Sequence, residues 1–300
     1  MKTIKGRYYY YRARGFDRVS HGDFRQAESL FEKSLYLAEQ SGSDYLRDIA
    51  VCNIAACRIE RGISDDDKVK ELKEMFMRTN HPKVARLATY HLARMYEIQK
   101  DFKKAFFYAR ISLEKSRLLG RSDYLASSLN QTANLLVAES HFEEASRLYT
   151  EAMGILHEAS ETVRFALIED NWGYCQMMQG KIQEGVAAVQ SSLERLERLQ
   201  AGPAYLVYPE MDLCYGYLEM DEPARAKEYG ERALLKAETI KQDNLVKNLL
   251  LLLGDCTMAL EDMDSAQSYY GELASFYPGV TTASDFLLAF NVRKVVNLRL

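Results

Sequence analysis

The chain has 300 residues and a formal net charge of −4, and 47% of its residues are hydrophobic. That apolar share is enough for a substantial core, whereas five prolines and sixteen glycines are too few for a loop-rich β fold or a disordered chain. Residues 1–150 hold 26 Lys and Arg against 20 Asp and Glu, and residues 151–300 hold 13 against 23. The halves therefore carry +6 and −10, which can steer oppositely charged partners to the two ends, although solvated helix faces contribute much of the difference.

The sequence contains no signal for export or membrane insertion. Met1 to Arg14 has basic residues but lacks the apolar stretch and small-residue cleavage site of a secretory signal. The longest apolar run, Leu249 to Leu253, is far shorter than the ~20 residues that span a bilayer. The five cysteines cannot all pair, so we expect small buried thiols in a reducing compartment. These features predict a soluble, cytoplasmic protein that does not bind membranes.

The first predicted elements form a pair of helices. Tyr8 to Val19 and Phe24 to Ser41 both carry apolar residues three and four positions apart, and His21 to Asp23 form the turn between them. The four tyrosines from Tyr8 to Tyr11 lie among arginines, a composition that could stack on bases and hold phosphate. On a helix, however, four successive side chains point in four directions. We therefore expect one or two to fill the core and the others to cover the N-terminal end, where another chain could also dock.

The second pair, between Asp44 and Asn80, is degenerate. A helix containing Ile49 and Ile54 is followed by an expanded turn at Ser64 to Asp67. The next helix is predicted to begin near Asp66, because aspartates are favourable at the positive helix start, and to bury Val69, Leu72, Met75 and Phe76. A calcium site in the aspartate run is not favoured, because neither the spacing nor a closing Glu matches a calcium loop.

The other pairs repeat one pattern with a period near 40 residues. An apolar residue begins each second helix, a tiny residue follows three positions later, and a small residue precedes the apolar one by nine positions. The leading residues are Phe24, Phe102, Phe142, Ile182, Pro223 and Met263; the tiny ones are Ala27, Ala105, Ala145, Gly185, Ala226 and Ala266; the preceding small ones are Gly15, Ala93, Ala133, Gly173, Cys214 and Gly254. Such a period is typical of stacked helix pairs, which form a solenoid. After Tyr277-Pro278-Gly279 the pattern stops, and residues 281–298 are predicted to form a capping helix.

These positions resemble tetratricopeptide repeats, whose units pair two antiparallel helices. The resemblance rests on sets such as Gly15/Phe24/Ala27/Phe31 and Ala133/Phe142/Ala145/Tyr149, and it covers nearly the whole chain. It implies an all-α, right-handed α-α superhelix of about seven pairs with a C-terminal cap, forming one domain over residues 1–300. The repeats fall near 5–42, 43–80, 83–120, 122–160, 162–200, 204–241 and 243–279. Units longer than the usual 34 residues resemble those of kinesin light chains, of bacterial peptide-sensing regulators and of sensor regions of bacterial transcription activators, so we expect a bacterial protein.

The family geometry implies a ligand groove lined by the first helices. Its slots lie three or four residues before, or one residue after, each small residue, and they begin with Arg12 and Phe16. Asn130 and Asn134, four residues apart, could hold a peptide backbone, and Tyr174 and Tyr215 offer flat contact area with a hydroxyl group. An alternative is that these side chains simply solvate an exposed inner face. The expected partner-binding residues are Arg94, Asn130, Asn134, Asp170, Asn171, Tyr174 and Tyr215.

No pattern typical of an enzyme is present in the sequence. The five histidines form no metal-ligand pair at helical spacing, and there is no phosphate-binding glycine loop or nucleophile elbow. We therefore predict a protein without enzymatic activity, metal or cofactor that acts as a protein- or peptide-binding scaffold. The alternative is a regulatory sensor in which a peptide or small signal in the groove alters partner binding. Nucleic-acid binding by the basic half is not favoured, and the solenoid ends could support homo-oligomers.

Overall fold

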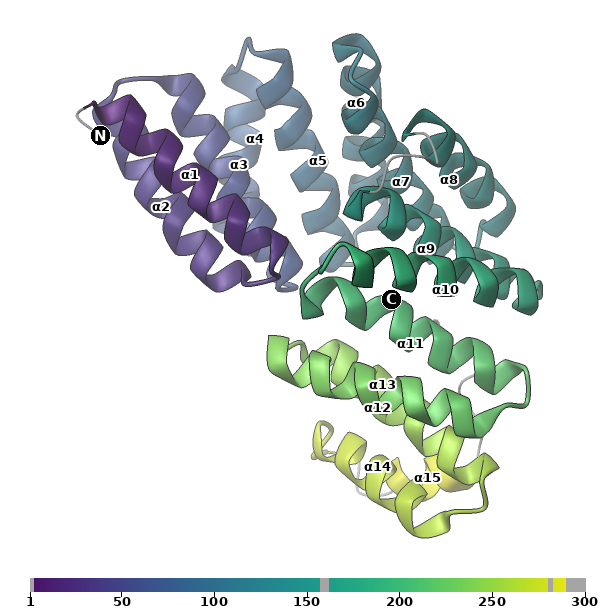
Figure 1. Cartoon of the computed structure of the whole chain (residues 1–300). Coiled ribbons are helices and arrows are strands. Elements are labelled where there is room, and N and C mark those ends of the chain that lie inside the picture. Colours follow the sequence, from purple (N-terminus) through teal and green to yellow (C-terminus); the bar gives the residue numbers. More distant parts are fainter. Residues whose placement is uncertain (1–2, 157–161, 280–282, 290–300) are drawn as a thin grey trace. The chain divides into compact units, whose positions relative to one another are not determined.

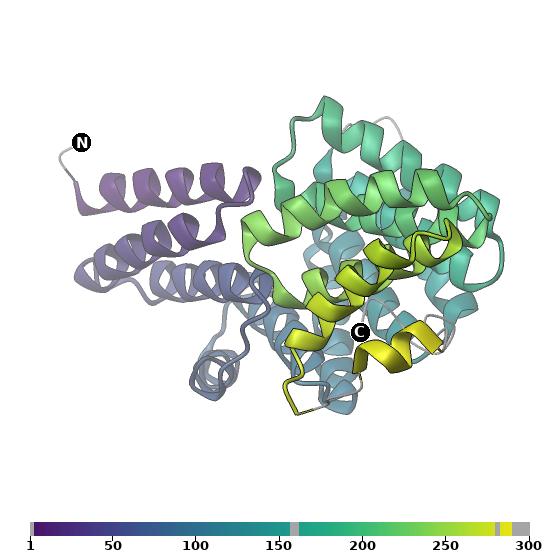
Figure 2. The same cartoon turned by 90° about the horizontal axis from the view of Figure 1, so that it is seen from below.

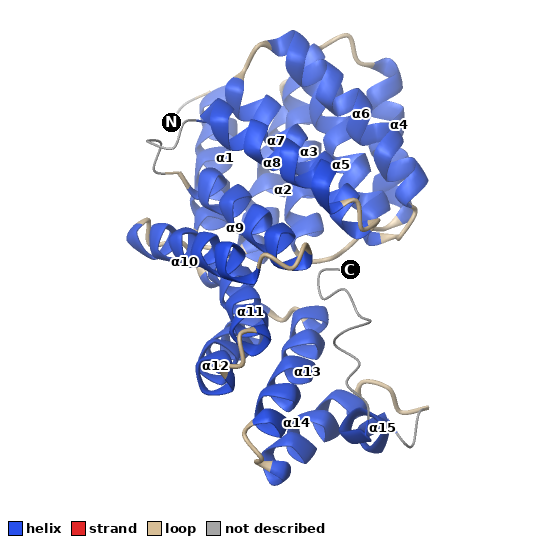
Figure 3. Cartoon of the chain, turned by 90° about the vertical axis from the view of Figure 1, so that its right-hand side faces the viewer, coloured by secondary structure: helices blue, strands red, loops and turns tan. Residues whose placement is uncertain are grey.

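The computed structural model describes residues 3–156, 162–279 and 283–289. Within these ranges the chain forms fifteen α-helices and no strand, joined by short turns (Figures 1 and 3). The prediction of an all-α chain of consecutive helix pairs is thereby confirmed. The helices are α1 Ile4–Ser20, α2 Phe24–Gln40, α3 Asp44–Glu60, α4 Asp66–Arg78, α5 Pro82–Ile98, α6 Phe102–Leu119, α7 Ser122–Ala138, α8 Phe142–Leu156, α9 Val163–Met178, α10 Ile182–Arg198, α11 Pro203–Glu219, α12 Pro223–Ile240, α13 Asp243–Ala259, α14 Met263–Ser275 and α15 Ala283–Ala289.

The chain divides into two compact units. Unit 1 comprises Met1–Leu136 and Arg147–Ser160, and unit 2 comprises Val137–Ser146 and Glu161–Leu300. In unit 1, α1 packs on α2, α2 on α3, and α5 on both α4 and α6. Figure 2 shows α1, α2 and α3 lying side by side. In unit 2, each helix from α9 to α14 packs on the next one along the chain, and α15 packs on α14. Continuity of one array over residues 1–300 stays a prediction.

One backbone conformation recurs in the turn inside every repeat except the degenerate second one. The residue two positions before the start of the second helix has a positive φ, whether or not it is a glycine. Several of these turns then use the next residue as an N-cap: the side chains of Asp23, Asp101 and Asp262 each accept a hydrogen bond from a backbone N–H three residues later. The left-handed residues are Gly22, Lys100, Ser140, Gly180, Asp221 and Glu261.

The small residues of the repeats allow the two helices of a pair to approach closely. A side chain added at Gly15 would meet the Phe31 ring at 2.5 Å, and one at Gly254 would collide with the Tyr270 ring. In the third repeat, Ala93 on α5 and Ala109 on α6 are both fully buried small residues. In these repeats the size of the residue on the second helix varies while the residue on the first helix stays small, as dense packing of the pair requires.

The degenerate second repeat follows the prediction. Helix α4 begins at Asp66, with Asp65 as its N-cap, and it buries Val69, Leu72 and Met75. Phe76 is half-buried and packs against the same core. Of the predicted capping helix, α15 covers residues 283–289, and the rest of the predicted range lies outside the described residues.

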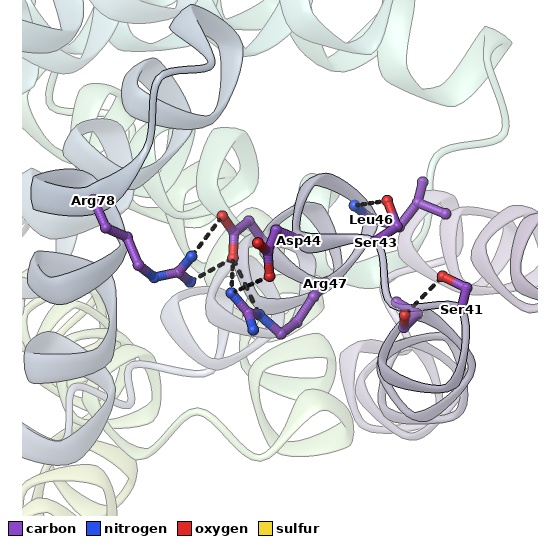
Figure 4. Close-up of polar contacts among 8 residues, drawn as sticks. Ser41, Ser43, Asp44, Leu46, Arg47 and Arg78 are labelled. Carbon is purple, nitrogen blue, oxygen red and sulfur yellow. Dashed lines mark hydrogen bonds and ion pairs between the residues drawn. The ribbon is translucent and has the colours of Figure 1, made fainter.

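Ion pairs hold α4 against α3. The buried carboxylate of Asp48 accepts a 2.6 Å hydrogen bond from Arg78 Nη2 at the C-terminal end of α4, and Arg47 lies on the same carboxylate (Figure 4). At the other end of α4, Arg58 Nη1 donates to Asp65 Oδ2 at 3.0 Å. These contacts attach a helix whose sequence departs from the repeat pattern.

The cysteines and the N-terminal tyrosines lie as predicted. All five cysteines are free and buried, and burial raises the pKa of the Cys57 thiol to about 12. Tyr8 is fully buried and donates a hydrogen bond to the Leu46 carbonyl at 3.2 Å, whereas Tyr9 and Tyr10 are exposed. Tyr11 packs partly against the same core. Among the described residues, no helix is long and apolar enough to cross a membrane.

Candidate binding surface of the first helices

Helices α5 and α7 bring three predicted partner-binding residues into one part of unit 1. These are Arg94, Asn130 and Asn134, and they are half-buried like the neighbouring Tyr90. Gln131 Nε2 on α7 donates to the Tyr90 carbonyl of α5 at 2.8 Å, which fixes the two helices to each other. Helix α5 begins with Pro82, whose lack of a backbone N–H has no cost in the first turn.

Arg86 supports the same helices from the buried side. Its guanidinium donates to Ser116 Oγ on α6 at 3.2 Å and to the Tyr124 carbonyl of α7 at 3.2 Å. It also lies over the Tyr90 ring, with 4.5 Å between the guanidinium carbon and the ring centroid. The half-buried row is therefore built on a framework that joins three helices.

Arg94 is the charged member of this row. Its guanidinium forms an ion pair with Glu60 of α3, so its charge is already partly balanced. Burial lowers the pKa of the Arg94 guanidinium, but Glu60, Tyr90 and Glu97 together raise it above its usual value. Burial also raises the pKa of Glu97, one turn further along α5, against the lowering influence of Arg94. A ligand carboxylate would therefore compete with Glu60 for Arg94.

The side chain of Asn134 has a hydrogen-bond partner inside its own repeat. Its Oδ1 accepts a hydrogen bond from the Tyr149 hydroxyl of α8 at 2.7 Å. The corresponding slot in the last repeat shows the same contact, from the Tyr270 hydroxyl to Asp255 Oδ1 at 2.5 Å. In the first repeat, the rings of Phe16 and Phe31 lie edge to face with centroids 5.2 Å apart. In these three repeats, the residue that directly follows the small residue of the first helix is thus in contact with an aromatic residue of the second helix.

Unit 2 holds the other four predicted residues, and two of them are deeply buried. Asp170 and Tyr174 on α9 expose 1% and 2% of their surface, whereas Asn171 and Tyr215 are half-buried. The ring of Tyr174 lies against that of Tyr215 on α11, with 6.4 Å between centroids. Asp170 and Tyr174 are therefore placed to support neighbouring side chains, and Asn171 and Tyr215 retain surface for a ligand.

Polar side chains also occupy a neighbouring slot, two residues before the small residue, of which the predicted set included only Asn171. In three consecutive first helices it holds Asn53, His91 and Gln131. Each keeps one buried polar atom without a hydrogen-bond partner among the described residues: Asn53 Nδ2, His91 Nδ1 and Gln131 Oε1. Burial, reinforced by Arg86 and Arg94, lowers the pKa of His91 to about 3. The available signal was the recurrence of polar residues at a fixed slot between strongly apolar positions.

Two further features of the described residues bear on what this surface can bind. In the parts of the chain that the structure describes, no three His, Cys, Asp or Glu side chains lie together as a possible metal site. Trp172 on α9 is half-buried and donates from Nε1 to Ser146 Oγ at 3.2 Å. The row on the first helices therefore offers amide, hydroxyl, guanidinium and aromatic groups, which suit binding of polar backbone and side chains.

Comparison with known proteins gave matches in structure only. No protein-family model and no curated protein sequence matches the chain. A Rap protein solved in complex with Competence and Sporulation Factor has a TM-score of 0.72 and 15% identity, over 96% of this chain and 78% of that one. A STAND protein from Pyrococcus horikoshii with a tetratricopeptide repeat sensor has a TM-score of 0.64 and 16% identity over 96% of this chain.

A third similar structure is a kinesin light chain-type protein from Podospora anserina with nearly identical TPR-like repeats. Its TM-score is 0.52 at 16% identity, over 66% of this chain and 96% of that one. The chain spans 45% of the length of the STAND protein, so it corresponds to less than half of that molecule. At these identities the likeness concerns the fold. The chain has the tetratricopeptide-repeat fold.

Proposed function

We propose that the chain is a non-catalytic scaffold that binds a protein or peptide along the exposed surface of its first helices. The observation that carries this proposal is the half-buried row of Arg94, Asn130 and Asn134 on adjacent helices of unit 1. Neighbouring helices hold these groups at fixed positions through Gln131 and Arg86. Groups that are already fixed lose little entropy on binding, which favours recognition of an extended chain.

Buried polar atoms without a hydrogen-bond partner in the described part of the chain lie beside this row and support the same proposal. Asn53, His91 and Gln131 each leave a buried donor or acceptor unpaired, at a cost to folding of about 1–3 kcal/mol for each group. Costs of this kind are common where binding rather than stability determines the residue. In unit 2, Asn171 and Tyr215 would supply a second set of contacts, supported by Asp170 and Tyr174 beneath them.

The solved structures favour one refinement, namely regulation by a bound peptide. The Rap protein was crystallised with Competence and Sporulation Factor, and the STAND protein carries a tetratricopeptide repeat sensor. We therefore propose as the second candidate that a peptide bound to the first helices alters the affinity of this chain for another protein. Such a device requires the ligand to prefer one conformation over another.

Selection from a random peptide display library tests the proposal. Peptides enriched on the wild-type protein should bind the Arg94→Ala/Asn130→Ala/Tyr215→Ala variant about tenfold more weakly or worse, because the removed groups supply specific contacts. The matched control is Arg25→Ala/Glu39→Ala, which removes exposed side chains of α2 and should leave affinity unchanged. Failure to enrich any peptide, or equal binding by the first variant, would count against the proposal. Circular dichroism would establish that both variants are folded.

A further inference from the structure

The second helices present one stripe of outward-facing side chains, at positions 1, 5, 8, 12 and 15 after the leading residue. In α2, α6, α10 and α12 these slots are exposed, apart from the half-buried Gln190. Since such residues make few contacts inside the repeat, their chemistry is free to serve an external partner.

The stripe of α6 is basic and carries large apolar groups. Lys103, Arg110 and Arg117 occupy three of its five slots, and Phe107 occupies a fourth with 57% of its surface exposed. Leu118, next to the last slot, is 80% exposed. Glu114 is the acidic member, and its 3.7 Å pair with Arg110 is fully solvated and therefore weak.

The stripe of α12 has the opposite character. Glu228, Glu231 and Glu238 occupy three slots, and Leu235, which is 66% exposed, occupies the fourth. The five stripe slots of α12 contain no basic residue. Beside them, Lys227 lies 3.8 Å from Glu231 in a solvated ion pair, and the Tyr269 hydroxyl donates to Glu231 at 3.4 Å. Arg232 and Lys236 pair with the buried carboxylate of Glu210. In α10 the same slots hold two glutamates but no large apolar side chain, and in α2 they mix both charges.

We propose that two copies of this chain associate by packing α6 of one copy against α12 of the other. If the helices run antiparallel, Phe107 faces Leu235, with Arg110 opposite Glu231 and Lys103 opposite Glu238. The same register places Glu114 opposite Glu228 and Arg117 opposite Ala224, so the attraction is concentrated in the first three pairs. The apolar pair would lie between two ion pairs, an arrangement in which the charges determine partner and register. The partner is identified as a second copy by charge complementarity. The basic stripe of α6 requires an acidic surface, and α12 of another copy provides one.

The interface is small, so the association is expected to be weak and sensitive to salt. Two stripes of this length bury less surface than a stable dimer needs, which places the complex among transient contacts. Because the contact joins different surfaces, copies form either a closed pair or an open chain, and both raise the average mass. This proposal concerns the outward faces of second helices and does not depend on the proposed function.

Sedimentation velocity over a range of protein concentrations tests the proposal. The average mass of the wild type should rise with concentration at about 0.05 M salt and fall back toward the monomer at about 0.5 M salt. Lys103→Glu and Glu238→Lys should each weaken self-association about tenfold, since each places like charges opposite one another. An equimolar mixture of the two variants should recover it, because the reversed charges then complement each other. Neither Lys103 nor Glu238 makes a side-chain hydrogen bond or ion pair in the described structure, so both variants should fold.

The first repeat supplies matched controls. Arg25 and Glu39 occupy on α2 the slots that Lys103 occupies on α6 and Glu238 on α12. Arg25→Glu and Glu39→Lys should therefore change the net charge equally without changing self-association. The proposal is overturned if the wild type stays monomeric at every concentration, if the controls weaken association as much as the test variants, or if the mixture fails to recover it. A monomer that binds anionic vesicles through Phe107 would instead assign the basic stripe to a lipid surface.

Discussion

His91 is a buried imidazole that folding keeps uncharged. It lies on α5 with 6% of its surface exposed, and burial with the nearby Arg86 and Arg94 lowers its pKa to about 3. The unfolded chain should titrate at about 6.5, so below that pH the unfolded state binds a proton that the folded state does not. The contribution of His91 to stability is therefore fully present above pH 6.5 and declines as the pH falls toward 3.

We predict that His91→Gln makes the protein less sensitive to acid. Between pH 7 and pH 5 the free energy of unfolding of the wild type should fall by about 2 kcal/mol more than that of the variant. Gln is the residue that α7 carries at the equivalent slot, as Gln131, which makes it a conservative replacement. Urea unfolding at both pH values measures the difference. His21→Gln, at an exposed position, should retain the wild-type dependence; equal slopes for all three proteins would contradict the burial argument.

Gly254 illustrates how one missing side chain determines a helix–helix contact. Adding a methyl group there would force it into the buried Tyr270 ring, whose hydroxyl is also bonded to Asp255. Gly254→Ala should therefore destabilise the protein by about 1–3 kcal/mol through overpacking. Gly271, an exposed helical glycine with open space where a Cβ would lie, is the control, and Gly271→Ala should stabilise by about 0.5–1 kcal/mol.

A double-mutant cycle tests the assigned cause of this effect. In a Tyr270→Ala background, the added methyl group at residue 254 no longer meets a ring, so the pair resembles Ala93 with Ala109 in the third repeat. The penalty for Gly254→Ala should then largely disappear. Thermal unfolding of the four proteins gives the coupling energy. A penalty of the same size in both backgrounds would place the strain elsewhere.

At the scale of single elements, the C-terminal ends of α6 and α12 show the same backbone conformation with two different residues. Both helices end at a left-handed residue, Gly120 at φ 64° in α6 and Lys241 at φ 57° in α12. Glycine adopts this conformation without steric cost, whereas for a residue with a Cβ it costs about 1 kcal/mol. We predict that Lys241→Gly stabilises the protein by about 0.5–1 kcal/mol and that Gly120→Lys destabilises it by a similar amount. Guanidinium unfolding of both variants measures this, and changes of the same sign would refute the argument.

The sequence predicted the helices well because their signals are local. The start of α4 at Asp66, in a repeat that departs from the pattern, followed from aspartates at the positive helix end and from the spacing of Val69, Leu72 and Met75. A turn at Lys100-Asp101 was predicted, but the left-handed conformation of Lys100 was not, because no glycine marks it. Its conformation is imposed by the two helices that it joins.

The candidate surface was less predictable, because the same slot has different surroundings in different repeats. The residue after the small one is half-buried and bonded to Tyr149 in the case of Asn134, but fully buried in the case of Tyr174. Tyr174 instead lies against the Tyr215 ring of α11, so its surroundings come from a helix of the next repeat. The spacing of residues along one helix does not reveal which side chains of other helices pack against them. Spacing therefore identified the residues of the row but not how exposed each one is.

At the scale of the molecule, stacked repeats transmit strain mainly to their neighbours. Gly15→Val should disturb the contact with Phe31 and therefore loosen α1 and α2. We predict that amide hydrogen exchange accelerates most in α1 and α2, less in α3, and not detectably in α13 and α14. Exchange measured by mass spectrometry on peptides from each helix gives the profile. Uniform acceleration over all described helices would show global rather than nearest-neighbour coupling.

The bond between Asn134 and Tyr149 also limits how this chain can evolve. Phe16 with Phe31 and Asp255 with Tyr270 share its spacing of fifteen residues, so the slot that we propose to face a ligand is physically linked to a packing slot in three repeats. A new specificity at Asn134 would leave the Tyr149 hydroxyl without its acceptor unless the tyrosine changed too. Divergent copies of this chain should consequently show paired substitutions at that spacing, with Tyr exchanged for Phe wherever the acceptor is lost.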